Sequence, residues 1–431
     1  MIRVLIIGSG GRESALAWSI SKSPLLEKLF CAPGNPGTAL IATNIDIDIK
    51  NFEAIKLIVM EHNITLVVVG PEEPLVNGLR DFFESHDQLK NCLFIGPGKK
   101  GALLEGSKEF AKNFMQKWSI PTASYMCFDS SSMHEADYFL EKLSAPYVLK
   151  ADGLAAGKGV VIHSNIDDAR RELQAMFNGK FGTAGRKVVI EEFLKGIELS
   201  VFILTDGKEY LILPEAKDYK RIGDGDTGLN TGGMGAVSPV PFAGEEFMRK
   251  VEERIIKPTI QGLVRDKIDY KGFIFIGLMN CEGDPYVVEY NVRMGDPETE
   301  AVLPRIKSDF LSHLVAAAQG KLSGEKIVTD SRVAMTIVAV SGGYPEDYKK
   351  GYLIKGLEKF EQDNDILLFH SGTKVSDGHV VTSGGRVLAL TTLAPDIHKC
   401  RQILYKEIEK ISFNDIYFRK DIGLDLMRYS K

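Results

Sequence analysis

The stretch PYVLKADGLAAGKGVVI, residues 146–162, decides how the middle of this chain is interpreted. Its glycines and lysines are typical of a segment that covers a phosphate. A Walker A loop needs G-x-x-x-x-G-K-[ST] between a strand and a helix, but the span from Gly153 to Lys158 is one residue too short and Gly159 follows the lysine. The VVI that comes next is β-branched and predicts a strand, whereas a dinucleotide fingerprint also needs a helix there. We therefore expect a strand, a glycine-rich turn and a second strand.

Bulk composition limits the class of protein. A chain of 431 residues predicts about two to four domains, and 44% hydrophobic with 26% charged residues is typical of a globular protein. The net charge of −5 argues against a nucleic-acid partner but leaves small anionic ligands open. The five scattered cysteines include no C-x-x-C pair, which favours a reducing cytoplasm. The chain begins at once with a strand and has no apolar run of about 20 residues, so we expect neither a signal peptide nor a membrane span.

Short apolar runs alternate with helix-length segments in residues 1–102. This alternation predicts parallel strands joined by crossover helices. Each run ends in a glycine- or proline-rich loop, and such loops lie at the carboxyl edge of a parallel sheet, where ligands bind. We therefore expect an N-terminal substrate-binding α/β domain. Its expected strands are residues 4–8, 28–34, 64–70 and 92–96.

Residues 103–326 predict a second, larger unit of mixed α and β structure. It begins with a helix at about 103–120, in which Ser107 has the side chain of an N-cap. The quoted stretch falls in a smaller piece, residues about 121–195, which we expect to form a flap subdomain. The polar, glycine-rich residues 218–241 predict a long loop. The other expected elements are strands at 199–207, 209–216, 272–280 and 285–293 and a helix at 245–265.

Residues 327–431 follow the turn-rich boundary GKLSGEK and predict a small C-terminal α+β domain. It is expected to close with a helix near 394–410 and a polar tail. Its expected strands are residues 332–340, 366–372 and 386–392.

The segment PYVVEYNVR, residues 285–293, carries the strongest chemical signal. Alternate residues of a strand share a face, so Glu289, Asn291 and Arg293 point the same way. A carboxylate and an amide oxygen suit Mg²⁺, which takes one or two protein carboxylates and completes its shell with substrate phosphates. Arg293 beside them is suited to a bidentate grip on a carboxylate or phosphate. The alternative is an ordinary half-buried strand with a solvated polar face.

The segment VVIEEFL predicts a nucleobase site. A strand runs into two acids, Glu191 and Glu192, and an apolar pair, Phe193 and Leu194. An apolar slot with backbone hydrogen bonds at its edge suits adenine. The alternative is an exposed strand end.

Three lysines and one loop point to an anionic ligand. Lys108 lies at an expected helix start, where backbone N–H groups favour anions. Lys150 ends the strand before the glycine turn, and Lys158 lies within the turn. Each lysine taken alone fits a solvated surface charge equally well. The glycine-rich residues 226–236 are either a linker or a place where backbone approaches a ligand, and their position inside one unit favours the second.

The N-terminal motif GSGGRE weakly resembles a dinucleotide fingerprint. Gly8 and Gly10 fit its first two glycines, but Glu13 replaces the third, and a carboxylate there would repel a pyrophosphate. A smaller substrate or a structural tight turn remain as interpretations. The sequence contains no zinc-type His/Cys spacing and no G-x-S-x-G elbow.

The order of these signals resembles the ATP-grasp fold. The motifs GSGGRE, VVVGPEEPL, GPGKKGALLEGSK, KADGLAAGKGVV, DTGLNTGGMGAVSP, EYNVRMGDPETE, FHSGTK and TSGGRVL are similar to those of the phosphoribosylamine–glycine ligase (glycinamide ribonucleotide synthetase) family. They are spread over essentially the whole chain. The resemblance implies a multidomain fold of α/β and α+β units: an N-terminal open parallel α/β sheet, a two-subdomain ATP-grasp core and a small C-terminal α+β domain.

The resemblance also implies site residues, with Lys150 and Arg293 as the catalytic pair. ATP would contact Lys108, Lys150, Gly153, Gly157, Lys158, Gly159, Glu191, Glu192, Phe193, Leu194 and, through its ribose, Glu198. Mg²⁺ or Mn²⁺ would bind Glu289 and Asn291. The other substrates would contact Gly10, Arg12, Glu13, Asp218, Lys220, Asn230, Thr231, Arg293 and Asp296.

Three positions depart from the family pattern. Ser14 and Tyr219 stand where the motifs usually have histidine. The strand GFIFIGLM, residues 272–279, lacks the acid that many ATP-grasp enzymes carry there. Metal binding is therefore expected to rest on Glu289 and Asn291 alone.

The implied activity is ligation of glycine to 5-phosphoribosylamine with ATP, through glycyl phosphate, the second step of de novo purine biosynthesis. We expect a cytoplasmic monomer or weak homodimer without nucleic-acid or membrane partners. One alternative is another ATP-grasp carboxylate–amine ligase or a purine-pathway carboxylase. Others are a nucleotide-binding module without turnover and a dinucleotide oxidoreductase, which Glu13 disfavours.

Overall fold

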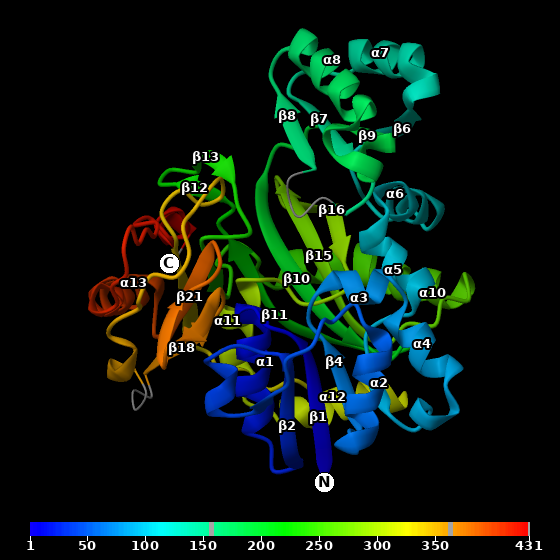
Figure 1. Ribbon diagram of the computed structural model, residues 1–431. Coiled ribbons are helices and arrows are strands. Elements are labelled where there is room, and N and C mark those ends of the chain that lie inside the picture. Colours follow the sequence, from blue (N-terminus) through cyan, green and yellow to red (C-terminus); the bar gives the residue numbers. More distant parts are fainter. Residues whose placement is uncertain (155–158, 361–364, 430–431) are drawn as a thin grey trace.

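The N-terminal residues form the open parallel sheet that the apolar runs predict (Figure 1). The computed structural model describes residues 1–154, 159–360 and 365–429. Runs such as Leu66–Val69 are fully buried, as strands of a helix-covered parallel sheet are. The strand order is β3-β2-β1-β4-β5, for β1 (Ile2–Gly8), β2 (Leu26–Pro33), β3 (Thr43–Asn44), β4 (Leu66–Val69) and β5 (Leu93–Ile95). Its helices are α1 (Gly11–Ser21), α2 (Phe52–Glu61), α3 (Glu72–Val76) and α4 (Leu79–Ser85).

The helix expected at 103–120 is two helices, α5 (Lys99–Gly106) and α6 (Lys108–Lys117). The expected N-cap at Ser107 is confirmed, because its hydroxyl accepts from the Phe110 N–H at 3.1 Å. A single helix was wrong because this cap starts a new helix directly after α5 ends.

The flap subdomain has its own core and projects from the rest of the molecule (Figure 1). The quoted stretch forms β7 (Tyr147–Ala151) and β8 (Val160–His163), which pair antiparallel and confirm the expected strand, turn and strand. Gly157 and Lys158 lie outside the described residues. The four-stranded sheet is completed by β6 (Tyr125–Asp129) and β9 (Lys187–Glu192), in the order β6-β9-β7-β8, with helices α7 (Met133–Lys142) and α8 (Ile166–Ala175).

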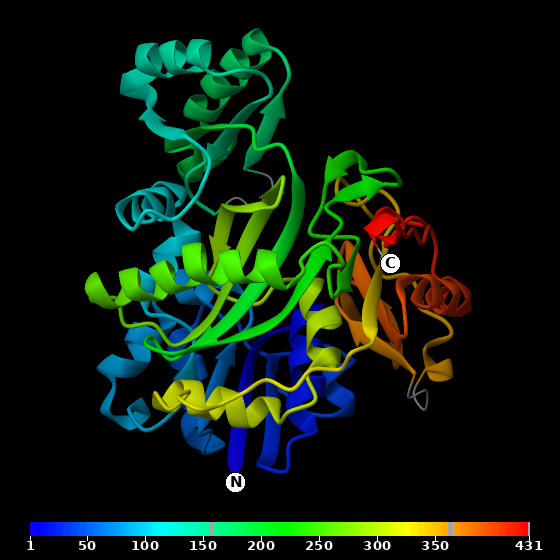
Figure 2. The same cartoon turned by 180° about the vertical axis from the view of Figure 1, so that it is seen from behind.

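An eight-stranded antiparallel sheet runs through the middle of the molecule into the C-terminal residues. The link is made by the pairing of Gly235–Ser238 with Val333–Val340. Figure 2 shows helices on the rear face of this sheet. The sheet order is β16 (Asp284–Asn291), β15 (Gly272–Cys281), β10 (Ile197–Thr205), β11 (Tyr210–Asp218), β14 (Gly235–Ser238), β17 (Val333–Val340), β21 (Arg386–Ala394) and β18 (Ile366–His370).

The expected long loop at 218–241 was wrong, since it contains three short strands. A hairpin of β12 (Arg221–Gly223) and β13 (Thr227–Asn230) stands on the surface, and β14 joins the central sheet. The polar sequence does not predict β12 and β13, because this hairpin is stabilised by contacts with distant residues and not by burial of its own side chains.

The helices expected at 245–265 and near 394–410 are confirmed. The first is α9 (Glu245–Val251) and α10 (Lys257–Arg265), joined by a π-helical turn at Glu252–Ile256, and the second is α13 (Ile397–Glu407). The sequence did not predict α11 (Glu298–Val302), α12 (Phe310–Gln319) or the hairpin of β19 (Thr373–Ser376) and β20 (His379–Thr382). Single 3-10 or π turns occur at Thr38–Leu40, Asp87–Leu89, Ser130–Ser132, Met176–Lys180, Gly182–Arg186, Leu303–Arg305, Leu357–Lys359, Ile408–Lys410 and Asp425–Tyr429.

One hydrophobic core joins the N-terminal sheet, the central sheet and the C-terminal residues, whereas the flap core is separate. The flap is thereby a packed unit of its own at one side of a larger body. Among the described residues, no helix combines the length and the apolar character needed to cross a bilayer.

Candidate active site

A cavity of about 370 Å³ lies where the N-terminal sheet, the flap and the central sheet meet. This size falls within the usual range for small-molecule sites, roughly 300–1,000 Å³. Its charged lining comes from eight separated parts of the chain. These residues are Arg12, Glu72, Glu105, Lys108, Lys112, Lys150, Glu191, Asp218, Lys220, Glu289, Arg293, Asp296, Glu298 and Arg386.

Glu289, Asn291 and Arg293 all line this cavity, and so do Val288 and Tyr290 on either side of Glu289. Strand β16 ends at Asn291, and Arg293 lies just beyond it. The Arg293 guanidinium donates to Asn291 Oδ1 at 3.2 Å and to Glu105 Oε1 at 2.8 Å. Its Nε lies 3.4 Å from Glu72 Oε2. Acids of the N-terminal half thus fix the arginine beside the two oxygen donors.

Glu289 has the electrostatic surroundings of a metal ligand. Burial would raise its pKa, but Lys220, Lys150, Lys108 and further cations lower it below the usual value. Its carboxylate and the Asn291 amide oxygen form the donor pair that Mg²⁺ takes from proteins. Within the described ranges, no three His, Cys, Asp or Glu side chains cluster as a metal site. The two oxygen donors, Glu289 and Asn291, fit an ion that keeps most of its shell for phosphates and water.

Lys150 and Lys108 approach the cavity from two sides. Lys150 is buried, donates to the Val288 carbonyl at 3.2 Å and lies 2.9 Å from Glu191 Oε2. Lys108 is the first residue of α6, and its ammonium reaches the Gly153 carbonyl at 3.4 Å. Burial lowers the pKa of Lys108. The turn after β7 is tied to the same helix start, since Asp152 Oδ1 accepts from Glu109 N–H at 2.7 Å.

Lys112 is a cavity residue that the sequence interpretation missed. Its ammonium lies 3.1 Å from Glu191 Oε1 and donates to Thr122 Oγ1 at 2.7 Å. Burial lowers its pKa to about 8. The spacing in the sequence could have revealed Lys112, because it follows Lys108 by about one helical turn and both residues therefore share a face of α6.

Glu191 and Glu192 point to opposite sides of β9, as neighbouring residues of a strand do. Glu191 is buried at the cavity, whereas Glu192 Oε1 accepts from the Ser124 N–H at 2.8 Å, away from it. Phe193 is 41% exposed. Among the described residues, the cavity lining includes neither Glu192, Phe193 nor Leu194. Its apolar walls come instead from Leu104, Ala111, Met115, Leu154, Val160, Phe275, Val288 and Tyr290.

Of the expected glycine flap, Gly159 lines the cavity and hydrogen-bonds Ala151 N–H through its carbonyl at 2.8 Å. Gly153 packs against Ala184 and offers its carbonyl to Lys108. Both glycines therefore border the ends of the turn.

The motif GSGGRE builds a fixed arginine at the N-terminal edge of the site. Glu13 accepts from the Gly10 N–H at 2.5 Å and from Arg12 Nε at 2.6 Å. A side chain at Gly8 or Gly70 would overlap Glu13, so these glycines make the space for its carboxylate. Arg12 lines the cavity and donates to the Met294 carbonyl at 3.3 Å. Gly10 and Glu13 thus position Arg12.

Lys220 is surrounded by carboxylates. Burial would lower its pKa, but Glu198, Asp218 and Glu289 raise it well above the usual value. Lys220 pairs with Glu198 and lies 4.0 Å from Glu289 Oε1. Thr231 donates to the Lys220 carbonyl through its N–H at 2.7 Å. Asp218, Lys220 and Thr231 line the cavity, whereas Glu198 lies behind Lys220 and Asn230 is exposed on β13.

The C-terminal residues contribute Arg386, which the sequence interpretation also missed. Its guanidinium pairs with Asp296 Oδ1 at 2.9 Å and donates to the Gly232 carbonyl at 2.7 Å. Burial would raise the pKa of Asp296, but Arg386 and Arg12 lower it. Nearby, burial and Asp218 raise the pKa of Glu298 to about 8. The motif TSGGRVL carried this arginine, but sequence alone does not place it beside Asp296.

Family models match three consecutive parts of the chain. These are the phosphoribosylglycinamide synthetase N domain at residues 2–105, its ATP-grasp (A) domain at 106–299 and its C domain at 334–425. The chain belongs to the phosphoribosylglycinamide synthetase family. The expected fold class, with its parallel N-terminal sheet, ATP-grasp domain and C-terminal domain, is confirmed.

Proteins similar to this chain match it over nearly its whole length. Phosphoribosylamine–glycine ligase of Caldanaerobacter subterraneus is 43% identical over 98% of this chain and 99% of its own length. That of Escherichia coli O157:H7 is 43% identical over 98% of both chains. The crystal structure of the Thermotoga maritima ligase has a TM-score of 0.85 at 35% identity, covering 97% of this chain and 100% of its own. Biotin carboxylase of Campylobacter jejuni, at 15% identity and a TM-score of 0.70, shares the fold.

The two histidine positions of the family motifs point away from the cavity in this member. Ser14 donates to the His370 carbonyl at 2.7 Å and accepts from Asn35 at 2.9 Å, which joins the N-terminal and C-terminal parts. Tyr219 is 2% exposed and its hydroxyl donates to Asp425. Neither residue is among the described residues that line the cavity.

Proposed function

We propose that this chain ligates glycine to 5-phosphoribosylamine with ATP, giving glycinamide ribonucleotide, ADP and phosphate. One observation carries the proposal: the lysines Lys108 and Lys150, the donor pair Glu289 and Asn291, and Arg12 of the N-terminal sheet line a single cavity. A nucleotide and a second anionic substrate can meet there. Relatives named phosphoribosylamine–glycine ligase, at 43% identity over nearly the whole chain, support the choice of substrates.

The nucleotide is held between the flap and the central sheet. Lys108 and Lys150 contact its phosphates, and Gly153 and Gly159 border them at the ends of the turn. The role of Gly157 and Lys158 toward the phosphates stays a prediction. Glu191 Oε1 is buried at the cavity and lies 3.1 Å from the Lys112 ammonium. A carboxylate oxygen has a second lone pair, which can accept from an amino group such as that of adenine. The contacts of Glu192, Phe193, Leu194 and Glu198 with the nucleoside stay predictions, because none of these four residues lines the cavity as described.

Glu289 and Asn291 hold Mg²⁺ or Mn²⁺ in this proposal. When bound, the ion neutralises charge on the phosphoryl group during transfer. Lys220, at 4.0 Å from Glu289, keeps this carboxylate ionised.

The reaction needs an activated carboxyl group, because a carboxylate is a poor electrophile. A glycine carboxylate oxygen bonds to the γ-phosphorus while the bond from that phosphorus to ADP breaks. The amine nitrogen then attacks the acyl carbon of glycyl phosphate, and phosphate leaves. Lys150 and Arg293 are the catalytic residues, which hold the transferring group and the carboxylate in line. The flap excludes water that would hydrolyse the acyl phosphate.

The phosphoribosylamine and glycine lie toward the N-terminal edge of the cavity. Gly10, Arg12 and Glu13 hold one side of them, and Asp296 and Arg293 face them across it. Asp218, Lys220, Asn230 and Thr231 complete this part of the site. The fixed Arg12, held by Glu13 and Met294, supports recognition of a phosphate.

The proposal places the enzyme in de novo purine biosynthesis, in the cytoplasm, as a monomer or weak homodimer. ADP release is measured with glycine, bicarbonate or formate against phosphoribosylamine or other amines. We expect turnover only with glycine, phosphoribosylamine and ATP together. Equal rates with bicarbonate or formate would assign the chain to another ATP-grasp reaction.

A further inference from the structure

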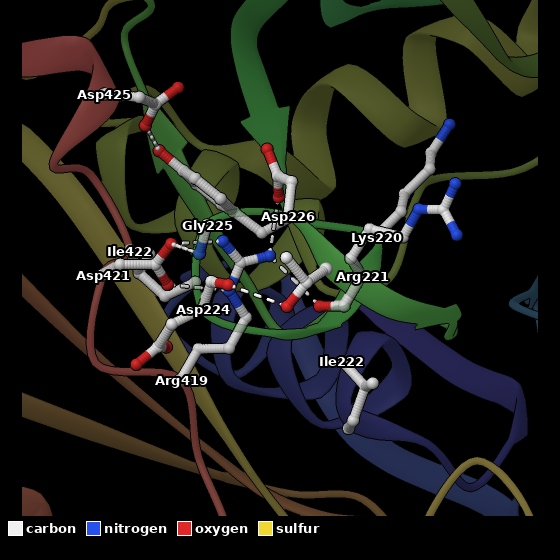
Figure 3. A network of polar contacts seen from close by, with 12 residues as sticks. Lys220, Arg221, Ile222, Asp224, Gly225, Asp226, Arg419, Asp421, Ile422 and Asp425 are labelled. Carbon is white, nitrogen blue, oxygen red and sulfur yellow. Dashed lines mark hydrogen bonds and ion pairs between the residues drawn. The ribbon is translucent and has the colours of Figure 1, made fainter.

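A segment near the C-terminus, residues 417–425, holds the β12–β13 hairpin by a set of hydrogen bonds, the grip (Figure 3). Arg419 is the centre of this contact, with a side chain only 1% exposed. One of its terminal nitrogens donates to the Arg221 carbonyl at 3.1 Å and to Asp226 Oδ1 at 2.7 Å. Its Nε and its other terminal nitrogen donate to the two oxygens of Asp421 at 2.8 and 2.6 Å. One guanidinium therefore joins the hairpin to the segment.

Further hydrogen bonds fix the tip of the hairpin to the same segment. The Gly225 N–H donates to Asp421 Oδ2 at 2.8 Å, and the Lys420 N–H donates to Asp224 Oδ1 at 2.8 Å. The tip needs left-handed backbone, with φ of 69° at Gly225 and 55° at Asp226. Aspartate is one of the few non-glycine residues that tolerate this conformation. The Asp226 carboxylate is also held by Arg419, so the hairpin tip is fixed on the segment.

The base of the hairpin is attached at Tyr219. Its hydroxyl donates to Asp425 Oδ1 at 2.6 Å and accepts from the Gly423 N–H at 2.9 Å. Tyr219 stands where the family motif usually has histidine. A histidine has no hydroxyl, so these two hydrogen bonds depend on the tyrosine of this sequence.

Lys220 lies between these two attachments. Its neighbours in sequence, Tyr219 and Arg221, are both bonded to residues 417–425, whereas the Lys220 side chain points away from Arg419 (Figure 3). It extends instead to the cavity, where it pairs with Glu198 and lies 4.0 Å from Glu289.

We infer that residues 417–425 position Lys220 in the active cavity, with Arg419 and Tyr219 as the positioning residues. The segment does not line the cavity and acts through the backbone on either side of the lysine. The role of Lys220 at the cavity rests on the proposed function, whereas the grip on the hairpin does not.

The grip is tested first by hydrogen exchange of the hairpin amides. Arg419→Lys keeps a buried cation beside Asp421 but cannot reproduce the planar fork that also reaches Asp226 and Arg221. Tyr219→Phe removes one hydroxyl. Lys420→Ala is the matched control, because Lys420 is exposed and contacts the hairpin through its backbone N–H. We expect exchange at residues 221–230 to rise about tenfold or more in the two test variants and to stay unchanged in the control. Unchanged exchange in both test variants would overturn the grip.

The positioning role is tested by a double-mutant cycle on kcat/KM, measured by single-turnover ADP formation. We expect Arg419→Lys to lower kcat/KM about tenfold in the wild-type background and less than about twofold in a Lys220→Ala background, because the effect passes through Lys220. Equal losses in both backgrounds would show a merely structural role. A wild-type chain without ligase activity would overturn the proposed function, and the exchange experiment would still decide the grip.

Discussion

At the scale of single residues, the site depends on charges that hold one another in place. Arg12 is fixed by Glu13, Arg293 by Glu105, and Asp296 by Arg386. Sequence periodicity singled out Glu289, Asn291 and Arg293, which all line the cavity, because alternation along a strand is a local property. It could not find Arg386, because its partner Asp296 is 90 positions away along the chain.

The metal assignment is tested at Glu289. Glu289→Gln keeps the volume and removes the ligand charge, so we expect ligase activity to fall about 10²- to 10³-fold. The Mg²⁺ affinity of the ATP complex, measured by calorimetry, should fall with it. Glu282→Gln, at an exposed turn between β15 and β16, is the control and should keep full activity. Activity of Glu289→Gln within twofold of the wild type would contradict the assignment.

The raised pKa of Glu298 predicts that the free energy of unfolding depends on pH. Burial first, and then Asp218, raise its pKa to about 8 in the folded chain, against about 4.5 when unfolded. The folded state then binds the extra proton, so the free energy of unfolding falls as pH rises between these values, by about 1.4 kcal/mol per pH unit at most. Glu298→Gln mimics the protonated form, and its side-chain carbonyl can still accept from Ser200.

Urea unfolding between pH 5 and pH 9 measures this effect. We expect the stability of the wild type to decline relative to Glu298→Gln as pH rises, with the difference levelling off above about pH 8. Parallel curves for the two proteins would show that Glu298 is ionised in the folded state.

At the scale of secondary-structure elements, strands with strong apolar patterns were predictable and polar strands were not. The strands of the N-terminal sheet were expected from their apolar runs, except the two-residue β3. The β12–β13 hairpin was missed because Arg419, some 190 residues later, holds it. Local sequence carries no trace of such a distant partner.

The start of α6 gives a prediction at this scale. Ser107→Ala removes the hydroxyl that caps the Phe110 N–H and also contacts Asp152 at 3.0 Å. We expect a loss of about 1 kcal/mol in the free energy of unfolding, measured by urea denaturation. Gln402→Ala, at an exposed position of α13, should change it by less than about 0.5 kcal/mol. Equal changes in the free energy of unfolding for the two substitutions would show that the Ser107 cap does not stabilise the fold.

At the scale of the whole molecule, the central sheet crosses the domain limit predicted from sequence near residue 326. Strand β14 pairs with β17, and one hydrophobic core joins the N-terminal, central and C-terminal parts. The limits 1–102, 103–326 and 327–431 stay predictions, which came from turn-rich sequence. Turn-rich sequence marks a surface connection but not which strands pair across it.

This continuity predicts the behaviour of a shortened chain. A chain ending at residue 326 would leave the β14 edge and the apolar surface under β17 uncovered, so we expect it to aggregate. Soluble expression and gel filtration of residues 1–326 measure this outcome. A soluble, cooperatively unfolding fragment would show that the C-terminal residues are an independent domain.

The central claim is that one cavity activates glycine by phosphorylation and passes it to an amine. Glycine labelled with ¹⁸O in its carboxylate tests this claim most directly, with mass spectrometry of the inorganic phosphate formed in a complete reaction. Attack by the carboxylate on the γ-phosphorus leaves one ¹⁸O in each phosphate, and the product amide keeps the other. Phosphate free of ¹⁸O would show that the ATP is hydrolysed by water, and it would contradict the account.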